Sequence, residues 1–201
     1  RMAGRSAGRV RAADAGVVVV NVGTQQSTSQ VAVDMAGAYK HVYAIIGLHP
    51  IHTDASYHDT DEIGEEGEGF TSRGEVFDTD YYRTLVQSSD RVIGLGETGL
   101  DYYRTTADSL DRQRAAFHAQ IELSLDLDLP LMFHVRPSQG SYDAYYDTLD
   151  ILDEYVNNHT YGDRLRGQFH FFAGDTDVAQ QVLDRGHMIS FTGVVTFAEQ
   201  Y

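Results

Sequence analysis

The chain has 201 residues, enough for one sizeable hydrophobic core, and thirty acidic residues against fifteen basic ones give it a formal net charge of −15 at pH 7. The absence of cysteine excludes disulfides, thiolate metal sites and cysteine nucleophiles. The longest apolar run, residues 15–20, is far too short to cross a bilayer, and no apolar stretch of signal-peptide length follows the first arginines, so we expect a soluble cytoplasmic protein without a membrane partner.

Short apolar runs and amphipathic stretches alternate in the first half of the chain. Residues 17–22 predict a strand of β-branched residues, and an amphipathic helix follows as far as Ala38. Residues 42–48 predict a second strand, which leads directly into His49. A third strand is predicted over residues 92–96.

The stretch between the second and third strands has a different composition. Residues 53–80 are acidic and rich in glycine, and they predict an extended surface insertion. Elsewhere neither a repeat nor a low-complexity segment interrupts the pattern, so residues 1–201 are expected to form a single domain that carries this insertion.

The second half of the chain continues the alternation. A long helix is predicted from about residue 109 to residue 128, and Pro130 then ends it and begins a fourth strand over residues 131–134. The later predicted elements are a helix around residues 145–156, a fifth strand over residues 167–172, a helix around residues 178–183 that Gly186 ends at its C′ position, and a sixth strand over residues 188–191.

Six strands joined by crossover helices predict a parallel α/β sheet. A doubly wound nucleotide-binding sheet would carry a glycine-rich phosphate loop after its first strand, and Val22-Gly23-Thr24-Gln25-Gln26 does not supply one. Functional residue types instead follow several different strands, which favours a (β/α)8 TIM-type barrel. Such a barrel has eight strands and roughly 250 residues, so this chain is expected to form an incomplete one.

Metal-binding residue types gather at the ends of the predicted strands. His49, Glu97, His134, Arg136 and His170 all lie at or just past such an end. Imidazole nitrogen and carboxylate oxygen together suit a catalytic divalent metal with positions left open for water. A carboxylate shared by two metals would give the arrangement used to hydrolyse phosphodiesters, in which metal-activated water replaces a serine or cysteine nucleophile.

These segments in combination resemble the TatD family of metal-dependent hydrolases, which belongs to the amidohydrolase-like superfamily. The similarity extends from about Val17 to the last residue, and it is carried by residues 94–104, His134-Val135-Arg136, residues 170–174 and residues 189–197, with a further signature at residues 47–52. The resemblance implies a barrel that hydrolyses phosphodiesters, typically a DNase acting from 3′ ends, with a divalent metal cofactor. Two ions of magnesium, manganese or zinc are expected.

The resemblance also implies a role for individual residues. Glu97 would be a catalytic ligand shared by the two metals, and His134 and His170 would be further ligands. Arg136 would face the same site as a catalytic and substrate-binding residue that clamps a phosphate. The remaining predicted substrate-binding residues are His49, His52, Asp101, Tyr103 and Arg104. Asp101 and Arg104 could equally form an ion pair that braces their loop.

The chain also departs from the family pattern at both ends. The family begins with a His-x-His pair on its first strand and places a metal-binding aspartate after its eighth, whereas here no histidine precedes His41 and the sequence stops at Tyr201. The six predicted strands therefore correspond to the family's second to seventh strands. We expect a fragment of a longer gene product, or a naturally shortened and inactive relative. By itself the chain is expected to be weakly active or inactive and prone to aggregate.

Two other functions remain open from the sequence. The same site could hydrolyse a small ester, lactone or amide, or the chain could be a non-catalytic acidic protein that has lost its metal. The acidic surface disfavours wrapping by nucleic acid, so the expected partner is DNA or another phosphodiester bound at a local cleft, with no obligate protein partner. The same surface could serve solubility alone, or it could reflect adaptation to high salt, where screening weakens the repulsion between acidic groups.

Overall fold

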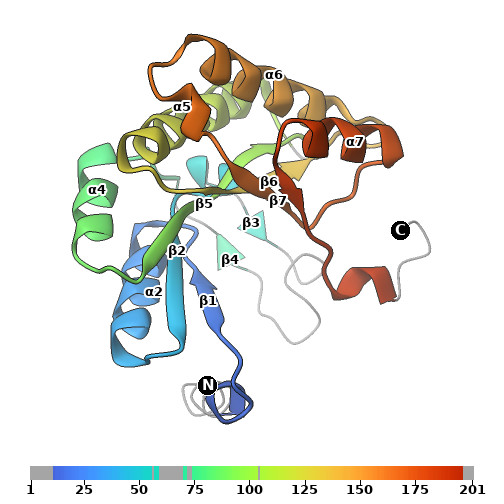
Figure 1. The fold of residues 1–201 in the computed structure, drawn as a ribbon. Helices are drawn as coiled ribbons and strands as arrows, with labels where there is room; N and C mark the ends of the chain where they lie inside the picture. Colours follow the sequence, from blue (N-terminus) through green and yellow to red (C-terminus); the bar gives the residue numbers. More distant parts are fainter. Residues whose placement is uncertain (1–10, 56, 59–69, 72–73, 104, 197–201) are drawn as a thin grey trace.

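The computed structural model describes residues 11–55, 57–58, 70–71, 74–103 and 105–196 (Figure 1). Its centre is a six-stranded sheet in the order β1-β2-β5-β6-β7-β8, in which every neighbouring pair is parallel. The strands are β1 (Val19–Val22), β2 (Val42–Ile46), β5 (Val92–Asp101), β6 (Leu131–Arg136), β7 (Gly167–His170) and β8 (Met188–Ile189). Their order in the sheet follows their order in the chain, as the prediction of successive crossover units requires.

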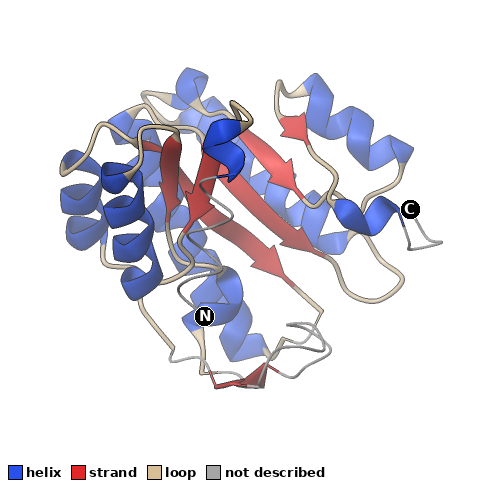
Figure 2. Ribbon diagram, turned by 90° about the horizontal axis from the view of Figure 1, so that it is seen from below, coloured by secondary structure: helices blue, strands red, loops and turns tan. Residues whose placement is uncertain are grey.

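The helices that connect these strands lie in an arc along one side of the sheet (Figures 1 and 2). They are α2 (Gln26–Ala38), α4 (Thr79–Gln87), α5 (Ala107–Leu127), α6 (Asp143–Asn158) and α7 (Thr176–Asp184). On the other side lies a short antiparallel pair, β3 (Tyr57–His58) and β4 (Phe70–Thr71). Sheet and helices together form the wall of an α/β barrel that is open between β1 and β8 across the described residues.

Local sequence explains where the helices begin and end. The side chain of Thr106 accepts a hydrogen bond from the Ser109 N–H at the start of α5, and Asp175 does the same for the Val178 N–H at the start of α7. Gly186 follows α7 at the C′ position with a φ of +78°, so its predicted role as the helix terminator is confirmed.

The core lies between the sheet and the helices. The side chains of Leu95, Phe133 and Phe169 on neighbouring strands are almost fully buried, and they meet Phe117 and Ile121 on α5 or Tyr145 on α6 in the same cluster. Phe133 lies edge-on to Phe117 and tilted against Phe169, with ring centroids 6.1 and 4.8 Å apart. Buried apolar residues on both layers thus fix the helices against the sheet.

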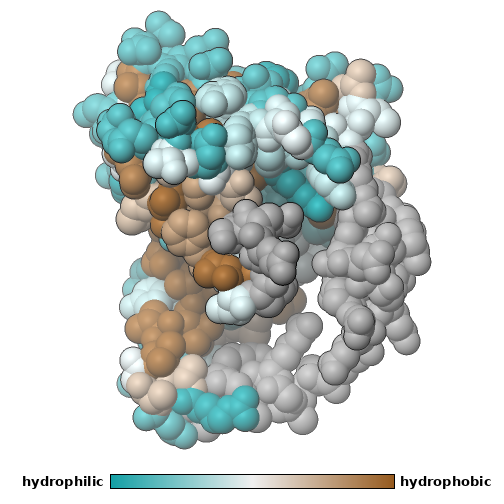
Figure 3. All heavy atoms as spheres, turned by 90° about the vertical axis from the view of Figure 1, so that its right-hand side faces the viewer, coloured by the Kyte–Doolittle hydropathy of each residue, from teal (hydrophilic) through white to brown (hydrophobic). Residues whose placement is uncertain are grey.

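The edge strands carry exposed apolar side chains. Val18 and Val20, at and before β1, are 61% and 40% exposed, and Met188 in β8 is 61% exposed. Figure 3 shows a face whose upper part is covered by hydrophilic residues, with apolar residues exposed below them. Among the described residues, none of the helices combines the length and apolar character needed to cross a membrane.

Several predicted strand limits are wrong. β5 continues to Asp101 instead of ending at residue 96, because its pairing with β6 extends as far as Asp101 opposite Arg136. β7 ends at His170, since Phe171 turns the chain with a φ of +54°. β1 and β8 are shorter than predicted, with bounds Val19–Val22 and Met188–Ile189.

Half of the surface insertion predicted for residues 53–80 falls outside the described residues, and the insertion stays a prediction. At its end the chain returns to the core, because Phe77 is buried and its ring stacks on Tyr82 at 4.4 Å. Helix α4, which the sequence interpretation did not include, begins where the Asp78 side chain accepts a hydrogen bond from the Tyr81 N–H.

Candidate metal centre

Glu97 projects from the middle of β5. The register between β5 and β6 shifts between Gly96, opposite Met132, and Thr98, opposite Phe133, so the ladder passes over Glu97. Such an irregularity turns a side chain out of the regular alternation and aims it toward a site. Glu97 is largely buried, with a side chain that is 16% exposed.

His134 lies between two carboxylates of the same strand. Its Nδ1 is 3.1 Å from Oε1 of Glu97, and its Nε2 is 2.9 Å from Oδ2 of Asp101. Burial works to lower the pKa of His134, but the hydrogen bonds with Asp101 and Glu97 and the charges of these two residues outweigh it and raise the pKa to about 9. The two carboxylates thus favour the protonated form of the imidazole.

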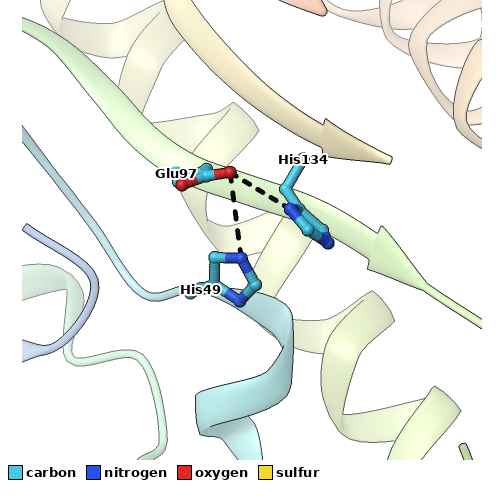
Figure 4. Close-up of side chains that lie close together, drawn as sticks. All are labelled: His49, Glu97 and His134. Carbon is cyan, nitrogen blue, oxygen red and sulfur yellow. Dashed lines mark hydrogen bonds and ion pairs between the residues drawn. The ribbon is translucent and has the colours of Figure 1, made fainter. Parts of the chain in front are cut away.

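His49 completes a group of three at the turn after β2. Its Nε2 is 3.8 Å from Oε1 of Glu97, and its ring centroid is 4.1 Å from that of His134. Figure 4 shows both imidazoles facing the same carboxylate oxygen of Glu97, and one ligand atom from each of the three residues lies within 4.8 Å of the other two. We call His49, Glu97 and His134 the donor group.

The surroundings of Glu97 favour the ionised form of its carboxylate. Burial pushes the pKa of Glu97 upward, but the hydrogen bond and charge of His134, followed by the charges of His170 and His52, hold it below its usual value. An ionised carboxylate surrounded by imidazoles is the form in which glutamate binds a metal.

The spacing of the donor group fits a metal ion. Two atoms bound to one zinc at about 2.0–2.2 Å in tetrahedral geometry lie roughly 3.4 Å apart. The separations of 3.1 Å from Glu97 to His134 and 3.8 Å from Glu97 to His49 lie on either side of that value. Asp101, at the other nitrogen of His134, supplies the carboxylate that metal-ligating histidines usually have as a second partner.

A positively charged side chain, that of Arg136, lies two residues beyond His134 at the end of β6. The guanidinium of Arg136 stacks over the ring of Tyr103 at 3.9 Å from its centroid. Tyr103 is held in turn by its backbone N–H, which donates to Oδ1 of Asp101 at 3.1 Å. Arg136 itself is the exposed residue at the end of β6.

Comparison with known proteins identifies the architecture. The sequence model of the family described as TatD related DNase matches residues 4–201. The chain belongs to this family. The uncharacterized metal-dependent hydrolase YcfH of Escherichia coli K12, a relative, is 33% identical over 170 residues, which cover 83% of this chain and 51% of YcfH.

Other relatives of the TatD family agree. The protein named 3′-5′ ssDNA/RNA exonuclease TatD of Salmonella typhimurium is 30% identical over 174 residues, covering 86% of this chain and 55% of its own. The uncharacterized metal-dependent hydrolase YabD of Bacillus subtilis is 30% identical over 179 residues, covering 89% of this chain and 58% of its own. The chain thus spans about half the length of the curated relatives it matches.

The solved structure of the TatD homologue YJJV from Escherichia coli K12 has the same fold. It matches with a TM-score of 0.69 at 21% identity, over 97% of this chain and 64% of that chain. A TatD family hydrolase from Entamoeba histolytica matches with a TM-score of 0.65 at 23% identity, over 91% of this chain and 54% of its own. The family resemblance and the barrel-type α/β fold inferred from the sequence are both confirmed.

Most of the predicted site residues that the structure describes lie on the central strands β5, β6 and β7 or in the turn after β2. Glu97 and His134 are neighbours, as their predicted role as metal ligands requires. His170 ends β7 opposite His134 and is close enough to affect the pKa of Glu97, but His49 takes the third place in the donor group. The metal-ligand roles of Glu97, His134 and His170 all stay predictions.

The structure places the other predicted substrate-binding residues differently from the exposed Tyr103 and Arg136. His49 and His52 are buried beside Glu97, with ring centroids 5.6 Å apart, and Nδ1 of His52 is 3.1 Å from the carbonyl oxygen of Thr24. Asp101 is only 4% exposed and contacts His134, which favours a role in orienting that ring. Arg104, with its suggested ion pair, lies outside the described residues.

Sequence reasoning missed the buried polar residues behind the site. Gln113 and Gln120 on α5 are 1% and 0% exposed, and both make hydrogen bonds with backbone groups beside the donor group. The signal was present, because both residues share a helical face with Phe117, where a polar residue is unusual.

Proposed function

We propose that the protein containing this chain is a metal-dependent phosphodiesterase that removes nucleotides from the 3′ end of single-stranded DNA or RNA. The observation that carries the proposal is the donor group with Arg136 beside it, at the carboxyl ends of parallel strands in a TatD fold. The relatives named as metal-dependent hydrolases and as a 3′-5′ exonuclease support the reaction class.

Glu97 and His134 would hold a divalent cation, with His170 as a further ligand and a second ion sharing Glu97. Magnesium, manganese and zinc all suit a set of carboxylate and imidazole donors. When bound, such an ion lowers the pKa of water and polarises a phosphoryl oxygen, so no nucleophilic side chain is needed. Asp101 keeps the imidazole of His134 oriented throughout.

The remaining residues bind and orient the substrate. Arg136 presents a planar guanidinium, already ordered by its stacking on Tyr103, to the non-bridging oxygens of a phosphate. The Nδ1 of His49 accepts a hydrogen bond from the Ile51 N–H at 3.2 Å, so Nε2 is the ring nitrogen that faces Glu97. His49 is proposed to line the cleft beside the same phosphate. His52 and Arg104 are proposed to line the cleft around it.

Degradation of end-labelled single strands by the full-length protein tests this proposal. With added manganese or magnesium, we expect progressive shortening from the 3′ end. Glu97→Gln should reduce the rate more than about 100-fold, with the circular dichroism spectrum unchanged. Substitution of residues that only orient metal ligands typically costs about 10–100-fold, and a lost ligand should cost more. Glu122→Gln, a carboxylate on α5 away from the donor group, is the matched control and should retain the wild-type rate. Equal rates for the two variants would contradict the proposal.

One observation favours a second candidate, the hydrolysis of a small ester, lactone or amide. The net charge of −15 opposes the long-range attraction of a polyanion. A panel of uncharged esters and lactones, assayed with the same metals and the same two variants, separates the two substrate classes. Turnover of a panel member that depends on Glu97, together with intact nucleic acid, would support the second candidate. Silence in both assays and absence of a bound divalent ion would indicate a non-catalytic relative.

A further inference from the structure

Two buried glutamines on α5 hold backbone segments on either side of the donor group. Gln113 and Gln120 lie seven residues apart, about two helical turns, so both side chains point to the same face of the helix. Each carboxamide forms a pair of hydrogen bonds with one backbone residue, accepting from its N–H and donating to its C=O. This pairing reproduces the pattern by which one strand holds another.

Gln120 holds the segment before His49. Its Oε1 accepts a hydrogen bond from the Leu48 N–H at 3.0 Å, and its Nε2 donates to the Leu48 carbonyl at 3.0 Å. The same Nε2 donates to the hydroxyl of Thr98 at 2.7 Å. One side chain therefore contacts Leu48, which precedes His49, and Thr98, which follows Glu97.

Close packing leaves little freedom at this contact. A Cβ on Gly47 would lie 2.5 Å from Oε1 of Gln120 and 2.7 Å from the carbonyl oxygen of Gly96, so only glycine lets the turn approach the helix. Thr98 and Leu48 are each 1% exposed. Water is thus largely kept from these hydrogen bonds, which strengthens them and makes an unmade one costly.

Gln113 holds the far end of β5. Its Oε1 accepts from the Asp101 N–H at 2.8 Å, and its Nε2 donates to the Asp101 carbonyl at 3.1 Å. The Asp101 carboxylate then orients His134 and fixes the backbone of Tyr103, on which Arg136 stacks. Displacement of Asp101 would therefore move both His134 and the guanidinium of Arg136.

We propose that Gln113 and Gln120 are positioning residues that set the separation of Glu97, His49 and His134 before a metal binds. α5 then acts as a template, with Gln120 aligning the His49 turn against Glu97 and Gln113 aligning Asp101 against His134. The inference rests on the proposed function only in taking the donor group as the metal site. It makes the preorganisation of that site depend on two uncharged side chains that contact no substrate.

Amide hydrogen exchange and manganese binding in the full-length protein test the proposal without an activity assay. In Gln120→Met, which preserves length and apolar volume, we expect the Leu48 N–H to exchange at least about tenfold faster and the manganese dissociation constant to rise about 10–100-fold. In Gln113→Met, the faster exchange should occur at the Asp101 N–H instead. Thr98→Val, which keeps the side-chain shape and removes the hydroxyl that Gln120 contacts, should weaken manganese binding with Leu48 still protected.

Ile121→Val is the matched control, because Ile121 is a fully buried neighbour on α5 that loses one methylene. It should change exchange across the whole core evenly and leave the manganese dissociation constant within twofold of wild type. Unchanged manganese affinity in both methionine variants, or losses no larger than in Ile121→Val, would overturn the proposal. If a methionine variant does not fold, Thr98→Val decides in the same way. Failure of the nuclease assay would leave these readouts unaffected, so the two proposals can fail separately.

Discussion

Tyr82 offers a direct measure of how much the turn before His49 depends on the helices around it. Its hydroxyl donates to the carbonyl of Gly47 at 2.9 Å, and the side chain is 1% exposed. Burial accordingly raises the pKa of Tyr82 well above its usual range. Tyr82→Phe removes this one oxygen and keeps the ring stacked on Phe77.

The expected cost follows from what remains around the Gly47 carbonyl. A buried hydrogen bond contributes about 1 kcal/mol net, and a buried group left without any partner costs about 1–3 kcal/mol. Ser29 Oγ, at 3.3 Å, still contacts the Gly47 carbonyl, so that second cost is only partly incurred. We expect a loss of about 1.5 kcal/mol in the free energy of unfolding, which lowers the Tm of a chain of this size by about 3–6 °C.

Urea denaturation followed by far-ultraviolet circular dichroism checks this value, with Tyr81→Phe as the control. Tyr81 is the adjacent residue, and its hydroxyl also donates to a backbone carbonyl, that of Gln26 at 3.1 Å, but this contact is only partly buried. Water can replace the lost group there, so the control should cost about 0.5 kcal/mol or less. If both variants lose the same stability at an unchanged m-value, burial of the Tyr82 hydroxyl has no special weight and the reasoning is refuted.

Three further predictions concern stability. Burial, and after it the charge of Arg185, lower the pKa of His187 below 6.5, although the charge of Asp153 acts in the opposite direction. At acidic pH the unfolded chain therefore binds a proton at His187 more readily than the folded chain does. The contribution of neutral His187 to the free energy of unfolding is present above about pH 6.5 and falls as the pH drops below it. In His187→Leu, the urea midpoint should therefore change less between about pH 7 and pH 5 than it does in the wild type. Asp175→Ala removes the acceptor for the Val178 N–H at 2.9 Å and should cost about 1 kcal/mol, whereas Asp175→Asn should cost less than half of that in the same titration. Adaptation to high salt predicts that Tm increases from about 0.1 M to about 2 M KCl, and a flat or falling curve would exclude it.

The sequence predicted the parts of the fold that depend on periodicity. Apolar runs and helical spacing located all six strands of the main sheet and four of the five helices that flank it in the described chain. They did not give the length of β5, because Gly96, Thr98 and Gly99 read locally as a loop. Only the pairing with β6, a contact between distant segments, extends the strand to Asp101.

The candidate site was predictable as a set of residues but not as an arrangement. His49 and His170 both follow strands, and nothing in the residue types says which one lies within reach of Glu97 together with His134. The roles of Gln113 and Gln120 were missed for a related reason. Glutamine on a helix is usually exposed, and its value here comes from the backbone groups that tertiary packing brings to it.

The position of Glu97 in β5 has a consequence for how such chains diverge. The β5–β6 ladder resumes at Thr98 after Gly96, so the residue between them can be replaced without the loss of a paired position in the sheet. Under the role proposed for Glu97, a substitution here would remove a metal-binding carboxylate and leave the paired positions of the β5–β6 ladder in place.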